Sequence, residues 1–165
     1  MSANGGPPSS MVRTTDPDEM RRALACVPSV LVAVGAHVEG QAVVMVASSF
    51  TAGVSFVPPL VTFAVQQSST TWKELRAAPR IGVSVLAKAH ADRARQLASR
   101  DRRRRLVDVP HHTTEFGAVL LDAAPARLET SIEHVYPAGD HELVVLRVLT
   151  MHHDATVDPL VWPDS

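Results

Sequence analysis

Short apolar runs rich in Val and other β-branched residues dominate residues 29–66. Four of them are seven or eight residues long and read "SVLVAVGA", "QAVVMVAS", "TAGVSFV" and "LVTFAVQ". Glycine, Glu-Gly and Pro-Pro separate them, which is the punctuation expected between β-strands. Because the runs are apolar almost throughout, the pattern favours a closed barrel or a two-sheet core.

Three further strands are expected later in the chain. "RIGVSVLA" is the first, and the long segments "PARLETSIEHVYPA" and "HELVVLRVLTMHH" follow, joined through "AGDH". Residues 106–124 show no clear period, so we interpret them as irregular. About six or seven strands with short connections predict a mostly antiparallel arrangement. The expected fold class is therefore mainly β, an antiparallel β-barrel with a few short covering helices.

Apolar spacing and capping signals predict two or three short helices, within residues 16–27, 69–80 and 90–105. Asp16 is the expected N-cap of the first helix. In the second helix, Ser69 or Thr70 is the expected N-cap, and Glu74 completes a start that is similar to a capping box.

The composition is that of one ordinary globular domain. A length of 165 residues is enough for a proper core. Residues 1–12 are rich in Gly, Pro and Ser and are expected to form a disordered tail, which leaves residues 13–165 as the folded domain. The net charge of −1 gives no general attraction to nucleic acid or to an anionic membrane.

The cysteine content and the N-terminal sequence favour the cytoplasm. Cys26 is the single cysteine, so neither an intrachain disulfide nor a Cys-based metal cluster is expected. The chain does not start with a basic segment followed by an apolar one. No uncharged apolar run reaches the roughly 18 residues that a membrane helix needs. We therefore expect a soluble cytoplasmic protein that does not span a membrane.

Two clusters of hydroxyl side chains flank the paired runs of residues 45–72. The first cluster, Ser48, Ser49 and Thr51, lies where a strand meets a turn, and small side chains there let a flat ligand approach the backbone. The alternative is a polar strand end, which composition alone favours. The second cluster, residues 68–71, precedes a helix, whose free N–H groups attract a phosphate. For this cluster, a simple N-cap and a phosphate site are equally good interpretations.

Arginines crowd one short segment, as Arg100 and Arg102 to Arg105. Such a run is most often a solvated face, and the interleaved Asp101 and the near-neutral total charge argue against nucleic-acid binding. Arg100 is the candidate to pair with a ligand phosphate.

The eight histidines include doublets at 111–112 and 152–153. Adjacent residues of a strand point to opposite faces, so neither doublet can chelate a metal as a strand pair, and no metal site is expected. The tight turn of Gly139 and Asp140 places His141 at the head of a strand. By itself such a turn is more often structural than catalytic.

Four segments in order carry a family resemblance: "MRRALACVPSVLVAV", "VASSFTAGVSFVPPLVTFAVQQSSTTW", "FGAVLLDAAPARLE" and "AGDHELVVLRV". Together they resemble the flavin reductase-like family, whose members have the FMN-binding split-barrel fold. The resemblance covers about residues 18–161. It implies that the antiparallel barrel is a split β-barrel.

The resemblance also implies where a flavin and a nicotinamide bind. The flavin ring is expected against the strand end formed by Val46, Ala47, Ser48, Ser49 and Phe50. The phosphate is expected at Ser69 and Thr71, with help from Arg100. The nicotinamide of NADH or NADPH is expected near Gly139, Asp140 and His141. His141 would be the catalytic residue in the sense that it orients the nicotinamide, without obligatory proton transfer.

Three places depart from the family pattern. Ser48 replaces a frequent Asn, so ring contacts are expected to rely more on the backbone. Gly53 is one extra residue before "VSFVPP" and is expected to shape a bulge. After "PLV", the usual polar and aromatic continuation that can cover the nicotinamide is replaced by "WPDS". Flavin binding is therefore better supported than reductase activity.

The leading hypothesis is an NAD(P)H-dependent flavin reductase that transfers a hydride to FMN or FAD. The resemblance implies a homodimer, and reduced flavin that diffuses to a partner monooxygenase. The alternative is a flavin-binding protein without efficient turnover, such as an electron carrier or sensor. A third hypothesis is a binding module of the same barrel for another planar ligand. The sequence does not separate FMN from FAD or NADH from NADPH.

Overall fold

The computed structural model describes residues 15–162. The tail predicted for residues 1–12 lies outside the described residues, as do both ends of the domain predicted for residues 13–165. The helices are α1 (Pro17–Leu24), α2 (Thr70–Leu75) and α3 (Ala91–Leu97), with 3₁₀ turns η1 (Lys88–His90) and η2 (Arg102–Arg104). The three predicted helices are confirmed, and each is shorter than the segment in which it was predicted.

The strands are β1 (Ser29–Val30), β2 (Val32–Val38), β3 (Gln41–Ala47), β4 (Thr51–Phe56), β5 (Pro59–Gln66), β6 (Ile81–Val85), β7 (His111–Thr113), β8 (Val119–Leu121), β9 (Ala126–Ala138), β10 (His141–His153) and β11 (Val161–Trp162). One seven-stranded sheet has the order β3-β2-β6-β9-β10-β5-β4, and every neighbouring pair in it is antiparallel. β1 pairs with β11, and β7 with β8, in two small sheets. The predicted mainly β, antiparallel architecture is confirmed.

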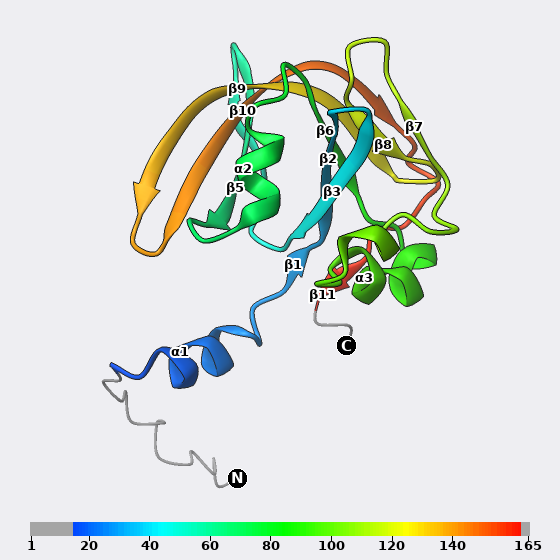
Figure 1. Ribbon diagram of the computed structural model, residues 1–165. Coiled ribbons are helices and arrows are strands. Elements are labelled where there is room, and N and C mark those ends of the chain that lie inside the picture. The colour runs from blue at the N-terminus through cyan, green and yellow to red at the C-terminus, as the bar shows by residue number, and fades with distance from the viewer. Residues whose placement is uncertain (1–14, 163–165) are drawn as a thin grey trace, which may run out of the picture.

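The two edge strands of the large sheet, β3 and β4, follow one another along the chain. Residues 48–50 join them, so the sheet curls until its first and last strands come close (Figure 1). β4 pairs with β5 through a register shift between Thr51 and Ser55. Gly53 lies inside this shift with a φ of 68°. The pairing is therefore irregular at the position where the bulge was expected.

Strand β2 is buried on both faces. Val32 and Val34 point into the main core with Phe63, whereas Ala33 packs into a second cluster that includes Leu97 of α3. Alternate residues of a strand face opposite sides, so a strand covered on both sides reads as a continuous apolar run. This explains the unbroken apolar pattern of "SVLVAVGA".

The prediction that residues 106–124 are irregular is wrong, because they contain β7 and β8. β8 crosses β6 so closely that a Cβ on Gly82 would lie 2.1 Å from the carbonyl oxygen of Val119. The N–H of Leu121 donates to the buried Ser84 hydroxyl at 2.9 Å. Strands of three residues give too little periodicity to be detected in a sequence.

Helix α1 begins as predicted, since the Asp16 side chain accepts a hydrogen bond from the Asp18 N–H at 2.9 Å. None of its residues is buried, and Figure 1 shows it standing apart below the sheet. Met20, Leu24 and Val27 are exposed. The apolar face of this segment therefore has no cover within residues 15–162. No helix in this part of the chain is long and apolar enough to cross a membrane.

Candidate functional site

The end of β3 and the end of β5 border a pocket of about 330 Å³, which we call the β3–β5 pocket. Its wall consists of residues 45–49, residues 64–66, Ser69 and His141. The pocket brings together several residues singled out in the sequence: Val46, Ala47, Ser48, Ser49, Ser69 and His141. Members of both hydroxyl clusters therefore line one cavity.

The two serines at the end of β3 have different surroundings. The Ser49 hydroxyl donates to the carbonyl oxygen of Ala64 at 3.1 Å and accepts from the Ala64 N–H at 2.7 Å. It therefore makes the contacts with β5 that a backbone ladder would otherwise make. Ser48 is exposed and lines the pocket. Of the two hydroxyls, Ser48 is the one that is available to a ligand.

Phe50 lies on the other side of the same loop. It lines a neighbouring pocket of about 460 Å³ together with Thr51, Val30 and Val161. Ser48 and Ser49 border this pocket as well as the β3–β5 pocket. The loop therefore separates the two pockets. Phe50 is partly buried and packs against the main core.

The Gly139-Asp140-His141 turn lies at the start of β10, beside the β3–β5 pocket. Gly139 has a φ of 63°, which side chains with a Cβ rarely adopt. Gln67 fixes the turn: its N–H donates to the Asp140 carbonyl at 3.1 Å, and its Nε2 donates to the Gly139 and His141 carbonyls at 3.3 Å. No sequence pattern indicated this role of Gln67, because its partners lie more than seventy positions further along the chain.

Asp140 and His141 are bonded to each other. His141 Nδ1 lies 2.7 Å from Asp140 Oδ1, and this bond lowers the pKa of Asp140. The Asp140 side chain is 86% exposed and that of His141 only 36%. Asp140 therefore holds the ring from the solvent side, and Nε2 is the ring nitrogen directed away from that bond.

The hydroxyls at the start of α2 also differ in their contacts. Ser69 caps the helix, accepting from the Trp72 N–H at 3.2 Å, and borders the pocket. Thr71 is buried, and its Oγ1 accepts from Arg105 Nη1 at 3.0 Å. Arg100 is exposed. Arg105 is therefore the member of the arginine run that reaches α2, and the sequence pattern did not single it out.

The capping box expected with Glu74 is not present. With Ser69 as N-cap, the third helical residue is Trp72, which carries no carboxylate. Glu74 instead accepts two hydrogen bonds from the Arg102 guanidinium, and these lower the pKa of Glu74. The prediction placed the carboxylate two residues too far along the helix.

Trp72 connects α2 to β10. It is 1% exposed, and its ring meets Phe63 edge to face with centroids 5.4 Å apart. Its Nε1–H donates to Glu142 Oε2 at 2.8 Å, and Arg76 approaches the other oxygen of Glu142 at 3.4 Å. Glu142 follows His141 directly. This bond therefore fixes the position of His141 relative to Ser69, across the pocket.

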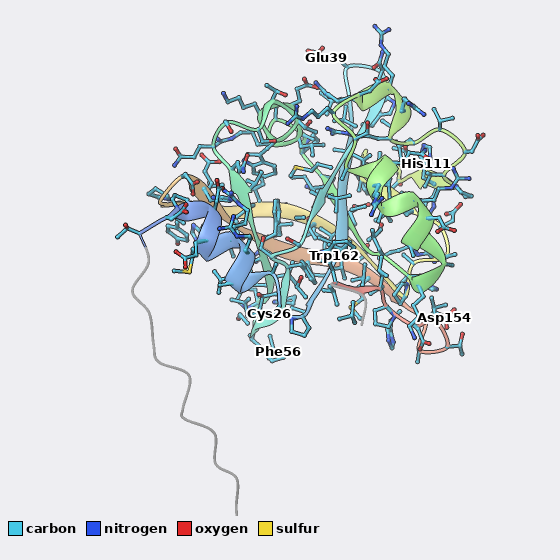
Figure 2. All side chains as sticks on the ribbon, turned by 90° about the horizontal axis from the view of Figure 1, so that it is seen from below. Cys26, Glu39, Phe56, His111, Asp154 and Trp162 are labelled. Atoms are coloured by element: carbon cyan, nitrogen blue, oxygen red, sulfur yellow. The ribbon has the colours of Figure 1, made fainter. Side chains whose placement is uncertain are left out.

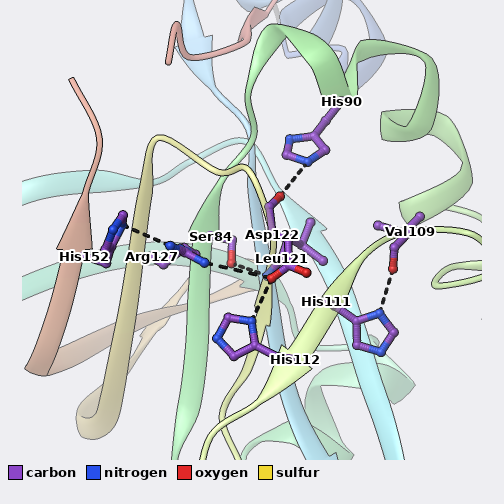
Figure 3. Close-up of polar contacts among 9 residues, drawn as sticks. All are labelled: Ser84, His90, Val109, His111, His112, Leu121, Asp122, Arg127 and His152. Atoms are coloured by element: carbon purple, nitrogen blue, oxygen red, sulfur yellow. Dashed lines mark hydrogen bonds and ion pairs between the residues drawn. The ribbon is translucent and has the colours of Figure 1, made fainter. Parts of the chain in front are cut away.

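Most of the histidines that invited a metal interpretation have structural partners (Figure 3). His90 Nδ1 accepts from the Ala87 N–H at 2.9 Å, and burial lowers the pKa of His90. His112 Nδ1 lies 2.8 Å from Asp122 Oδ1. In residues 15–162 no group of three or more His, Cys, Asp or Glu side chains is arranged to hold a metal ion.

The fold is that of an antiparallel β-barrel protein, and the β3–β5 pocket lies between the end of the edge strand β3 and the end of β5. The family model described as "Flavin reductase like domain" matches residues 20–165. The chain belongs to this family, and the family expected from the sequence is confirmed.

Two curated relatives from Streptomyces match most of the chain. The "Actinorhodin polyketide dimerase" of Streptomyces coelicolor is 30% identical over 149 residues, covering 90% of this chain and 84% of the relative. The "NADH-dependent FAD reductase" of Streptomyces globisporus is 32% identical over 160 residues, covering 91% of this chain and 84% of the relative.

Solved structures share the fold. An NADH:FAD oxidoreductase of Streptomyces globisporus, in complex with NAD and FAD fragments, has a TM-score of 0.85 and 28% identity, covering 93% of this chain and 92% of the other. The styrene monooxygenase flavin reductase of Pseudomonas putida S12 has a TM-score of 0.74 and 26% identity, covering 87% and 91%. The split-barrel fold class is confirmed.

The Trp72–Glu142 hydrogen bond should contribute measurably to stability. Trp72→Phe keeps most of the buried ring and leaves the carboxylate without its donor, so we expect the free energy of unfolding to fall by about 1.5–3 kcal/mol. Arg76→Ala is the matched control: it removes the half-exposed ion pair of the same carboxylate, which is worth about 0–1 kcal/mol. Urea unfolding measures both. Equal losses in the two variants would show that the indole bond is not special.

Proposed function

We propose that the protein is an NAD(P)H-dependent flavin reductase, an oxidoreductase that transfers a hydride from NADH or NADPH to FMN or FAD. The observation that carries this proposal is the β3–β5 pocket, in which Val46 to Ser49, Ser69 and His141 lie together in a chain of the flavin reductase family. Its product, reduced flavin, would serve a flavin-dependent monooxygenase partner, as the name of the styrene monooxygenase flavin reductase states for that protein.

The pocket fits a flavin in size and lining. Its volume of about 330 Å³ lies in the range of about 300–1,000 Å³ that is usual for small-molecule sites. Ala47, Ser48 and Ala64 have small side chains, so a flat ring can reach the strand backbone. The Ser69 hydroxyl lies at the same pocket for a phosphate. The residues predicted to hold the ring and the phosphate stay a proposal. Of the predicted phosphate residues, Thr71 is buried and bonded to Arg105, and Arg100 is exposed.

The residues of the chain would act by binding and orientation. A bound flavin supplies the hydride acceptor, and transfer needs the donor carbon about 3–3.5 Å from it. Ser48 and the backbone of β3 would hold the ring edge. His141, with Nδ1 bonded to Asp140, would offer Nε2 to the nicotinamide carboxamide. Gln67 keeps the Gly139 turn in place while the nicotinamide enters and leaves.

Steady-state oxidation of NADH with added FMN or FAD tests the proposal. We expect turnover that depends on both substrates, together with binding of flavin by the purified protein. Flavin binding without NADH or NADPH oxidation would instead support the carrier or sensor alternative. Absence of flavin binding would leave only the third hypothesis, another planar ligand.

In the same assay, His141→Ala should raise the KM for NAD(P)H about tenfold, the equivalent of 1.4 kcal/mol. Flavin affinity should change little, because the ring contacts are expected from β3. Gln67→Ala is a useful comparison, since it loosens the turn and leaves the imidazole in place. If the KM and the turnover of His141→Ala match the wild type, the histidine is structural.

Ser69→Ala should weaken FMN more than riboflavin, because only FMN carries a phosphate. A hydrogen bond to a charged group is worth about 1.5–3 kcal/mol, so the FMN dissociation constant should rise about tenfold or more. Loss of the helix cap costs about 1 kcal/mol of stability and affects both flavins alike, so the ratio isolates the phosphate. Thr71→Ser retains a hydroxyl and is the control. An equal loss for FMN and riboflavin would reduce Ser69 to an ordinary cap.

We further propose a homodimer that covers α1 and the neighbouring surface. Met20, Leu24 and Trp162 are 43%, 58% and 47% exposed. Figure 2, seen from below, shows α1 on the face turned to the viewer, with Cys26 just beyond its end and Trp162 further in. Exposed apolar patches of this kind mark interaction sites. The cytoplasmic location expected from the sequence stays a prediction.

Light scattering at micromolar concentration should give twice the 17.7 kDa mass of the chain. Replacing Met20 and Leu24 together by Ser should shift the protein toward monomer, because it removes the apolar side chains of α1. Val54→Ser on the exposed part of β4 is the matched control. A stable monomer for the wild type would refute the dimer.

A further inference from the structure

A second, larger hollow lies along the first half of β3. It has a volume of about 580 Å³ and is lined by residues 41–44 of β3, Glu74 of α2, Arg102, Arg103 and Leu106. We call it the arginine pocket. None of the steps described above uses it.

The arginine pocket continues the β3–β5 pocket along the same two elements. Residues 41–44 of β3 line the former and residues 45–49 line the latter. Helix α2 likewise contributes Glu74 to the first and its cap, Ser69, to the second. The six residue steps of β3 from Gln41 to Ala47 span about 20 Å at roughly 3.3 Å per residue. A ligand of about this length that lies along β3 would reach both pockets.

The outer edge of β3 offers free backbone groups along this path. β3 is an edge strand, and the Val44 carbonyl accepts from Arg105 Nη1 at 2.7 Å instead of joining a ladder. Ala42, two residues earlier, directs its N–H and C=O to the same edge, because strands repeat every two residues. Adenine carries a hydrogen-bond donor, N6, next to an acceptor, N7. One outward-facing residue of an edge strand can complement that pair.

Arg105 connects β3 to α2, the two elements that line both pockets. Its guanidinium donates to three neutral oxygens: the carbonyls of Ser99 and Val44, each at 2.7 Å, and the Thr71 hydroxyl at 3.0 Å. It forms no ion pair with a carboxylate in residues 15–162. Burial and the nearby Arg102 lower the pKa of Arg105. A partly buried cation of this kind gains most from an anionic ligand.

The charges inside the arginine pocket leave one further cation. Arg102 is neutralised by Glu74, through the two hydrogen bonds described above. Arg103 is exposed, and within the described residues it makes no ion pair. Two pockets therefore border β3, with Arg105 bonded to β3 and α2, and the wider pocket contains Arg103, a second cation without an ion pair in the described residues.

We infer that the flavin substrate is the dinucleotide FAD in preference to FMN, with Arg105 beside its diphosphate and the arginine pocket holding its adenylate half. This inference rests on the proposed function and adds the substrate class. Arg105 would also position the site, since it joins β3, α2 and the loop that follows α3. Arg103 would contact only the adenylate half, so it affects FAD alone.

Dissociation constants for FAD, FMN and riboflavin test the inference, measured by quenching of flavin fluorescence. Wild-type protein should bind FAD about tenfold or more tightly than FMN. Arg103→Ala should remove most of this advantage and leave FMN and riboflavin unchanged. Arg104→Ala is the matched control, an exposed arginine of the same run that lines neither pocket, and it should preserve the FAD:FMN ratio.

Two further measurements address Arg105 and the adenylate. Arg105→Gln should reduce FAD affinity at least tenfold relative to riboflavin, and Arg105→Lys, which keeps the cation, should lose less. ADP alone should compete with FAD and not with riboflavin. Circular dichroism of each variant confirms that the fold is intact. Because Arg103 is exposed, the Arg103→Ala variant still tests the inference if the Arg105 variants do not fold.

Several results would overturn the inference. Equal affinity of the wild type for FAD and FMN would do so, as would an Arg103→Ala variant that behaves like Arg104→Ala. Competition of ADP with NADH, but not with FAD, would assign the arginine pocket to the hydride donor. These outcomes differ from a failure of the proposed function, in which none of the three flavins binds or no NADH is oxidised.

Discussion

The curled sheet brings β3 next to β5, and these two strands share no hydrogen-bonded ladder. The β3–β5 pocket depends on how the gap between them is closed. Here side chains form the hydrogen bonds to strand backbone that a neighbouring strand forms elsewhere in the sheet. Ser49 bonds both backbone groups of Ala64, and Arg105 bonds the carbonyl of Val44. Between such isolated contacts the edge of β3 stays open. The pockets lie along this edge because the ladder ends there.

Much of the architecture follows from local pattern. The apolar runs of β2, β3 and β5, the cap at Asp16 and the irregular pairing at Gly53 are each decided by neighbouring residues, so they can be read from the sequence. β7 and β8 could not be predicted, because three residues carry no period and the pair is held by contacts such as Gly82 against Val119. Strand pairing of that kind is decided by packing in three dimensions.

The site shows the same division. Ser69 was indicated by its position at the start of a helix and His141 by the family resemblance, and both line the β3–β5 pocket. It could not find Gln67 or Glu142, since each acts on a partner about seventy positions away. A run of arginines likewise does not reveal which one turns inward. Arg105 does so because Ser99, Val44 and Thr71 converge on it from three separate elements.

The outer edge of β4 is a potential site of aggregation, and the residues around it counteract this. In residues 15–162 this strand pairs on one side only, and an unpaired edge can recruit strands from other molecules into fibrils. The register shift at Gly53 distorts the edge, and Pro58, which lacks an N–H, lies in the turn that joins β4 to β5. Phe56 and Val57 at the tip of the hairpin are 81% and 93% exposed, which favours aggregation through this edge. The irregular edge keeps an apolar hairpin from seeding aggregation while the gap beside β3, at the opposite edge, stays accessible.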